Sequence, residues 1–145
     1  GQLGKELTLK VEDLMKHRDE LKPLSLNSSF LEVISELTRS GIGSCWIKDE
    51  KNMKKLIGII TDGDLRRALR HYEPNVWESL VAEEMMTKDP IIIEPDIFAI
   101  EALKLMEDNS KKQSVSVLPV INVKSEFLGI LRLHDLVQAG LKENK

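Results

Sequence analysis

Cysteine is almost missing from this chain: Cys45 is the single one among 145 residues. One cysteine cannot close an internal disulfide, and it excludes a cysteine-rich zinc site. A reducing compartment is the simplest expectation for such a chain. Cys45 lies in an apolar segment, which favours a buried, inert thiol over a nucleophile.

Long apolar runs and an excess of one charge are also missing. No apolar stretch approaches the roughly 18 residues that suggest a membrane span, so we expect no transmembrane segment. The chain carries 24 acidic and 21 basic residues, a formal net charge of −3. This near balance, without a motif of basic and aromatic residues, argues against binding of nucleic acid.

Familiar catalytic motifs are absent as well. The sequence has no P-loop, GxGxxG, HExxH or CxxC pattern, and its Ser, His and Asp residues show no recognisable local arrangement. His17 and His71 are isolated, so we expect no metal site, and Trp46 and Trp77 are expected to be packing residues. The sequence therefore shows no pairing of a general base with a nucleophile that would make this chain an enzyme by itself.

What the sequence does contain is an internal repeat at an offset of 71 residues. Three pairs of segments share that offset: 13–15 with 84–86, 56–60 with 127–131, and 64–65 with 135–136. We therefore predict a first repeat over 10–76 and a second over 80–141. Residues 1–9 are interpreted as a linker from a longer protein, and residues 142–145 as a tail.

Each repeat is predicted to run helix, strand, helix, strand, strand, helix. Apolar residues recurring at helical spacing and short apolar runs bounded by polar turns carry this prediction. Asn27 and Asp96 are the predicted N-caps of the two longer helices. The expected elements of the first repeat are 11–15, 24–26, a helix with its apolar face over 30–37, 44–47, 56–60 and a helix that starts within 62–64 and runs to 71; those of the second are 81–86, 91–93, a helix with its apolar face over 99–106, 115–121, 127–131 and 135–140.

This order, with the segment Gly-Ile-Ile-Thr-Asp-Gly-Asp-Leu at 58–65, resembles the CBS domain. CBS motifs come as tandem pairs, called Bateman modules, that pack sheet to sheet with pseudo-two-fold symmetry. The resemblance covers residues 10–141 and implies an α/β fold. It also implies a homodimer, because CBS pairs commonly dimerise into a flat disc.

A narrower resemblance links the chain to arabinose-5-phosphate isomerases of the KpsF/GutQ family. The segments that carry it are 1–4, 9–15, 61–69 and 133–140. In that family the isomerase chemistry resides in a preceding sugar-isomerase (SIS) domain, so the resemblance implies that this chain is not itself the enzyme. It implies a tethered SIS domain, a tetrameric parent, a cytoplasmic location, and a role in making Kdo for lipopolysaccharide.

Thr61 and Asp64 are the sharpest candidates for ligand contacts. In CBS motifs that bind nucleotides, a Thr and an Asp three residues later bind ribose and phosphate, which here implies Thr61, Asp64 and the neighbouring Asp62. A helix N-terminus adds favourable dipoles for a phosphate. The alternative is equally open: Thr61 and Asp64 also fit a simple capping box.

Arg66 and Arg67 follow one turn later and could contact a phosphate or carboxylate. Together with Arg70 they could equally be a solvated helix face.

In the second repeat Thr87, Lys88 and Pro90 form a junction that lines the ligand cleft in CBS pairs, although the proline explains the turn by itself.

The second repeat departs from the nucleotide pattern. Arg132 stands where the first repeat has Thr61, and His134 where it has a glycine, while Asp135 is retained. Arg132, His134 and Asp135 could therefore face an anionic group. We favour the alternative in which this second site binds nothing, or Arg132 pairs with an acidic residue.

The expected function is regulatory binding of a nucleotide or nucleotide-sugar, with no cofactor required. For an enzyme of Kdo synthesis the end product CMP-Kdo is a sensible feedback ligand, and an adenine nucleotide is the more general expectation for a CBS pair. The alternative is a ligand-free assembly module that holds subunits together.

Overall fold

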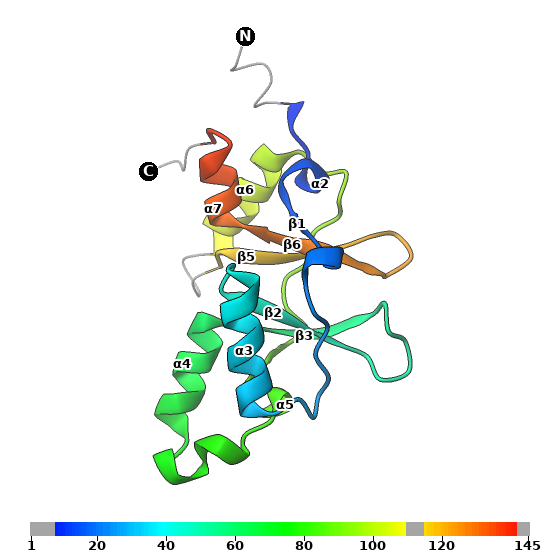
Figure 1. Ribbon diagram of the computed structural model, residues 1–145. Coiled ribbons are helices and arrows are strands. Elements are labelled where there is room, and N and C mark those ends of the chain that lie inside the picture. The colour runs from blue at the N-terminus through cyan, green and yellow to red at the C-terminus, as the bar shows by residue number, and fades with distance from the viewer. Residues whose placement is uncertain (1–7, 110–114, 142–145) are drawn as a thin grey trace. The chain divides into compact units, whose positions relative to one another are not determined.

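The computed structural model describes residues 8–109 and 115–141, and it divides into two compact units. The middle unit is the continuous segment Asp19–Pro90. The outer unit combines Gly1–Arg18 with Ile91–Lys145. Each unit holds one three-stranded antiparallel sheet with helices packed on it, so the predicted α/β fold is confirmed (Figure 1).

The middle unit builds its sheet in the order β2-β3-β4. Its elements are α3 (Phe30–Ser40), β2 (Ser44–Lys48), β3 (Leu56–Thr61), α4 (Asp62–His71), the 3₁₀ helix η2 (Pro74–Ser79), α5 (Ala82–Met85) and β4 (Thr87–Lys88). Helix α3 packs on β2, and α4 packs on β3 and α5. The N-terminus of α4 therefore lies directly at the end of the central strand.

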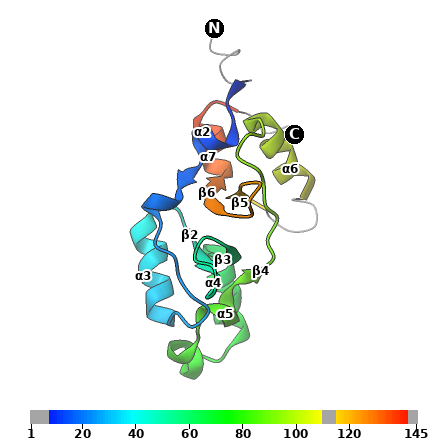
Figure 2. The ribbon, with the colours of Figure 1, turned by 90° about the vertical axis from the view of Figure 1, so that its right-hand side faces the viewer.

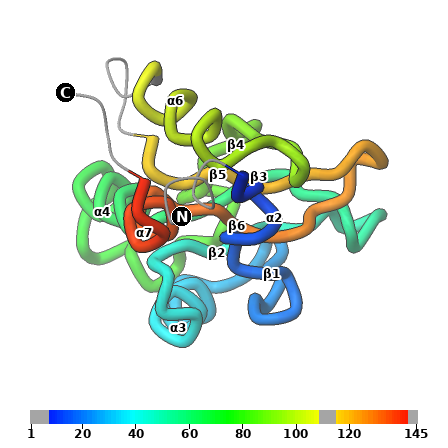
Figure 3. The backbone as a smooth tube through the Cα atoms, turned by 90° about the horizontal axis from the view of Figure 1, so that it is seen from above, coloured from blue at the N-terminus to red at the C-terminus, as the bar shows by residue number. Residues whose placement is uncertain are grey.

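The outer unit builds its sheet in the order β1-β6-β5. Its elements are α2 (Val11–Leu14), β1 (Lys16–His17), α6 (Ala99–Asn109), β5 (Val117–Ile121), β6 (Phe127–Arg132) and α7 (Leu133–Gln138). Lys16 in β1 lies opposite Ile130 in β6, so segments from the two ends of the chain are neighbours (Figure 3). The short 3₁₀ helix η1 (Arg18–Glu20) begins in the outer unit and ends in the middle unit.

The sheet of each unit contains one short strand that comes from the other sequence repeat. Strand β4 follows the first helix of the second repeat, yet it pairs with β3 of the first repeat, with Thr87 opposite Ile59 (Figure 2). Strand β1 follows the first helix of the first repeat and pairs with β6 of the second. The compact units therefore do not coincide with the repeats that the offset of 71 residues suggested.

The predicted N-caps are both wrong. Helix α3 begins two residues later than Asn27 suggested, with Ser29 as its cap, and the Ser29 hydroxyl accepts from the Glu32 N–H at 3.2 Å. Helix α6 begins at Ala99, beyond Asp96. In each case one intervening residue remains extended because it forms an isolated antiparallel bridge to another segment: Ser29 with Val81, and Phe98 with Lys10.

Three further boundaries differ from the sequence prediction. The strands expected at 24–26 and 91–93 reduce to single parallel bridges, Leu24 with Ile47 and Ile93 with Val120. The two-residue strands β1 and β4 were not predicted. Helix α7 begins at Leu133, two residues before its predicted start, and ends at Gln138. The linker over 1–9 and the tail over 142–145 lie almost wholly outside the described residues.

The apolar faces predicted for the long helices form the two cores. Val33 and Leu37 of α3 are buried in the middle unit. The buried residues of α6 in the outer unit are Ala99, Ala102, Leu103 and Met106. Within the described part of the chain, no helix combines the length and the apolar character needed to cross a membrane.

Candidate functional site

The candidate site lies where β3 ends and α4 begins. Thr61 is the N-cap of α4, and its hydroxyl accepts from the Asp64 N–H at 3.1 Å. In return Asp64 Oδ2 accepts from the Thr61 N–H at 2.9 Å. This is the reciprocal capping box that the sequence left open as one of two interpretations.

Asp64 does more than cap the helix. Its Oδ2 also accepts from the Thr61 hydroxyl at 3.1 Å, and its Oδ1 accepts from the Thr87 hydroxyl at 2.7 Å. The guanidinium of Arg67 donates to the same Oδ1. Thr87 comes from β4, so the Asp64 carboxylate joins α4 to a strand that is distant in sequence.

The two partners of this ion pair differ in exposure. The Asp64 side chain is 5% exposed, whereas that of Arg67 is 70% exposed. Asp62 and Arg66 are exposed and do not join the hydrogen bonds of Asp64. Arg70 is exposed as well, so of the three arginines on α4 only Arg67 contacts the predicted aspartate.

The start of β2 and the residue before it bring two residues to the same place, Ser44 and Gly43, which the sequence analysis did not name as site residues. Ser44 lies directly opposite Thr61 in the β2–β3 register and is fully buried. Its hydroxyl has no hydrogen-bond partner among the residues that the structure describes. Gly43 has φ of 68°, and a Cβ on it would stand 2.6 Å from Asp62 Oδ2. A Gly-Ser pair at the start of an otherwise apolar strand was the available signal.

The matching junction of the outer unit is closed by an ion pair. Asp135 Oδ2 accepts from the Arg132 N–H at 2.9 Å, and Asp135 Oδ1 accepts from Arg132 Nη2 at 2.7 Å. The Arg132 side chain is 22% exposed. The favoured interpretation, in which Arg132 pairs with an acidic residue, agrees with this geometry. His134 is exposed and takes no part in the pair.

The remaining predicted residues lie apart from the Asp64 carboxylate. Lys88 is exposed in β4, opposite Gly58. Pro90 is half-buried and ends the middle unit. Of the residues in the junction that follows α5, only Thr87 reaches the site.

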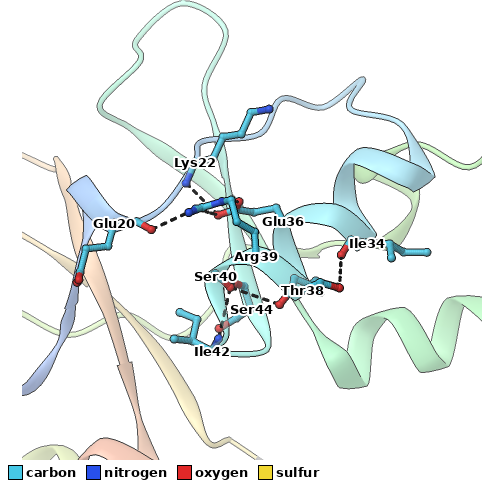
Figure 4. Close-up of polar contacts among 10 residues, drawn as sticks. Glu20, Lys22, Ile34, Glu36, Thr38, Arg39, Ser40, Ile42 and Ser44 are labelled. Carbon is cyan, nitrogen blue, oxygen red and sulfur yellow. Dashed lines mark hydrogen bonds and ion pairs between the residues drawn. The ribbon is translucent and has the colours of Figure 1, made fainter.

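A second polar cluster of the middle unit was not predicted at all (Figure 4). Glu36 of α3 is 2% exposed, and its carboxylate accepts from the Lys22 N–H at 2.9 Å and from Arg39 Nη2 at 2.7 Å. Arg39 also donates to the Glu20 carbonyl at 3.1 Å. The hydrogen bond to Glu36 raises the pKa of Arg39 above its usual value. This cluster fixes the segment after η1 onto α3.

Cys45 is fully enclosed in β2, as its apolar surroundings predicted. Burial, with a smaller contribution from the charge of Glu36, raises the pKa of its thiol to about 12. A thiol that stays protonated at neutral pH is a poor nucleophile. Among the described residues, no group of three or more His, Cys, Asp or Glu side chains is arranged to hold a metal ion.

Comparison with known proteins gives consistent matches. The CBS domain family matches residues 11–71 and 81–142. The arabinose 5-phosphate isomerase KdsD of Pseudomonas aeruginosa is 39% identical over 142 residues, which are 97% of this chain and 41% of that protein. KdsD of Salmonella typhimurium is 36% identical over 141 residues, 97% of this chain and 40% of that protein. The chain thus spans about two fifths of the length of these curated relatives.

Solved structures show the same fold. The CBS domain pair of protein MJ0100, in complex with 5′-methylthioadenosine and S-adenosyl-L-methionine, has a TM-score of 0.74 and 25% identity, over 90% of this chain and 94% of that one. CBSX2 in complex with AMP has a TM-score of 0.72 and 20% identity, over 90% of this chain and 95% of that one.

Proposed function

Because this chain belongs to the CBS domain family, as a tandem pair, we propose that it is a regulatory module that binds an adenine nucleotide at the start of α4. The prediction of a tandem CBS pair is confirmed by the family match over both repeats. The structural relatives in complex with AMP and with S-adenosyl-L-methionine support the choice of ligand class.

The observation that carries this proposal is the group formed by Thr61, Asp64 and Ser44. A buried carboxylate accepts well from the two hydroxyls of a ribose. The N–H groups of the first turn of α4 and the helix dipole favour a phosphate beside it. Ser44 adds a buried hydroxyl without a partner among the described residues, on the same face of the sheet as Thr61. A ligand atom in that position would satisfy it.

The parent enzyme of this proposal is a cytoplasmic arabinose-5-phosphate isomerase with a tethered SIS domain. The support is the identity to KdsD over nearly the whole chain, at about two fifths of the length of KdsD. In such an enzyme of Kdo synthesis, CMP-Kdo is the alternative ligand, acting as feedback inhibitor. Either ligand would regulate only by binding one conformation of the enzyme more tightly than another.

The test is the melting temperature of this chain with AMP, ADP, ATP, CMP, CMP-Kdo and S-adenosylmethionine. A ligand at 100 times its Kd stabilises by about 2.7 kcal/mol, which is several degrees for a domain of this size. We expect one nucleotide to give such a shift, and Asp64→Asn to abolish it. The matched variant Asp135→Asn should keep the shift. Absence of a shift with every compound would overturn the proposal.

One observation favours a second function, a ligand-free assembly module that forms a homodimer. Both junction aspartates, Asp64 and Asp135, already have protein partners for their carboxylates. Sedimentation equilibrium of the chain separates the two functions. A concentration-independent dimer combined with no ligand shift would support assembly, and a ligand shift in a monomer would contradict it.

A further inference from the structure

The Asp64 carboxylate has no vacant acceptor position in this structure. An ionised carboxylate offers about four acceptor positions. Asp64 uses them for the Thr61 N–H, the Thr61 hydroxyl, the Thr87 hydroxyl and the Arg67 guanidinium. A ribose hydroxyl can therefore bind Asp64 only if one of these donors leaves.

The four donors differ in how easily they leave. The Thr61 N–H belongs to the backbone at the start of α4, and its hydroxyl caps the same helix. Thr87 is held by the pairing of β4 with β3. The Arg67 guanidinium is at the end of a long, flexible side chain that is 70% exposed. It can rotate into solvent without breaking any secondary structure.

The direction of the Arg67 side chain also matters. Side chains on a helix point back toward the N-terminus, over the preceding turn. The guanidinium of Arg67 accordingly reaches the first turn of α4, at Asp64. This is also where the helix dipole favours an anion. A short rotation would carry the guanidinium from the carboxylate to a phosphate bound at that end of the helix.

We propose that Arg67 is an exchangeable cover of Asp64: its guanidinium moves to the ligand phosphate when a ribose hydroxyl takes its place on the carboxylate. This inference rests on the proposed nucleotide site. It has a consequence for specificity. A nucleotide supplies a new anionic partner for the displaced guanidinium, whereas a nucleoside removes its partner and supplies none. Arg67 therefore sets a preference for phosphorylated ligands.

The chain offers a matched control on the same helix. Arg66 is also exposed and cationic, but it does not contact Asp64. Long-range attraction between the positive end of α4 and a phosphate would depend on both arginines about equally. Exchange at Asp64 depends on Arg67 alone.

The experiment is titration calorimetry with AMP and adenosine on the unsubstituted chain, Arg67→Ala and Arg66→Ala. If only the cytosine series binds, CMP and cytidine replace them. The preference for a nucleotide is the ratio of the Kd of adenosine to the Kd of AMP. We expect Arg67→Ala to lower this ratio about tenfold, which corresponds to the loss of one charge-assisted hydrogen bond. Part of this change should come from tighter binding of the nucleoside, because without the Arg67 guanidinium Asp64 Oδ1 can accept from a ribose hydroxyl. Arg66→Ala should leave the preference within a factor of two or three.

The outcomes separate this inference from the proposed function. If the unsubstituted chain binds AMP but Arg67→Ala keeps the same preference, the exchange is wrong and the nucleotide site stands. Weaker binding of both compounds by Arg67→Ala in equal proportion would also contradict the exchange. If no nucleoside or nucleotide binds any of the three chains, both proposals fail. A melting curve of Arg67→Ala like that of the unsubstituted chain confirms that the variant is folded.

Discussion

The junctions at the ends of β3 and β6 share one backbone design and differ in the cation that completes it. In both, an aspartate three residues into the junction accepts from the backbone N–H of the cap residue at 2.9 Å. In the middle unit the cation is Arg67, one turn further along the helix and 70% exposed. In the outer unit it is the cap residue itself, Arg132, at 22% exposed.

This difference teaches that a junction aspartate is not by itself evidence of a ligand. Asp64 and Asp135 both have a structural task, because each satisfies backbone donors at the start of a helix. Only in the middle unit is the neighbouring cation free to move without disturbing the cap. The capacity to bind a ligand is thus set by the residue that covers the carboxylate.

The long helices differ in a related way. At the position where α3 buries Glu36, the matching residue of α6 is Leu105, two turns from each helix start. The carboxylate of Glu36 binds the segment that follows η1, an insertion that the second repeat lacks. The middle unit therefore depends on buried polar contacts where the outer unit uses apolar packing.

The largest difference is expected for removal of the two junction aspartates. Asp64→Ala should lower the free energy of unfolding by about 3 kcal/mol, because it removes a buried carboxylate and leaves the half-buried Thr87 hydroxyl and the cap of α4 without their acceptor. Asp135→Ala should cost about half as much, since only Arg132 loses its partner. Urea denaturation of the two variants measures both values. Equal costs would show that the bond between Asp64 and Thr87 adds nothing.

The contrast between α3 and α6 is sharpened by Glu36→Ala. We expect a loss of about 2 kcal/mol, because the Lys22 N–H and the Arg39 guanidinium both lose a buried acceptor. Ser35→Ala, at an exposed position of the same helix, should change the free energy of unfolding by about 0.5 kcal/mol or less. Both follow from thermal or urea unfolding. A small cost for Glu36→Ala would mean that water replaces the carboxylate.

The first long strand of each unit, an edge strand of its sheet, carries a different residue at its second position: Cys45 in β2 and Leu118 in β5. The folded pKa of Cys45 is raised from 9.0 to about 12, so above pH 9 the unfolded chain releases the thiol proton first. The stability that this thiol contributes is complete below pH 9 and falls toward pH 12, by about 1.4 kcal/mol per pH unit. Cys45→Val should make the alkaline decline of stability less steep by that amount. An unchanged decline would contradict the burial of the thiol.

The smallest effect separates the two arginines. Arg132→Ala should destabilise the chain by about 1 kcal/mol, since a half-buried pair with several hydrogen bonds is lost. Arg67→Ala should cost less than about 0.5 kcal/mol, because its exposed charge is screened by solvent. The difference between the two melting temperatures is the measurement. A larger cost for Arg67→Ala would argue that Arg67 is a fixed part of the fold and not an exchangeable cover.

Much of the architecture follows from the sequence because it is periodic. The apolar spacing of α3, the strand β3 over 56–60 and the helix α4, expected to start within 62–64 and to end at 71, were predicted where the structure has them. The strands β1 and β4 could not be predicted, because two residues have no measurable period and their partners lie far away in the sequence. The N-caps failed for a similar reason: a bridge to a distant segment decides where each helix begins.

The candidate site was predictable in part. Thr61, Asp64, Arg67 and Thr87 were all named from the sequence, and the structure brings them into one hydrogen-bonded group. Which arginine of α4 contacts Asp64 was not predictable, because Arg66 and Arg67 differ only in their angle around the helix. Glu36 escaped prediction because a charged residue on an apolar face is buried only when a distant backbone N–H reaches it.

Strands β1 and β4 each pair with a strand of the other repeat, and this has a consequence for the order in which the chain can fold during synthesis. The middle unit is continuous, so all of its contacts become available once Pro90 has left the ribosome. Strand β1 is synthesised before that unit, yet its partner β6 follows long after it. Closing so long a loop is slow and costs conformational entropy. The growing chain can therefore complete the middle unit first, while β1 stays unpaired until β6 has been synthesised.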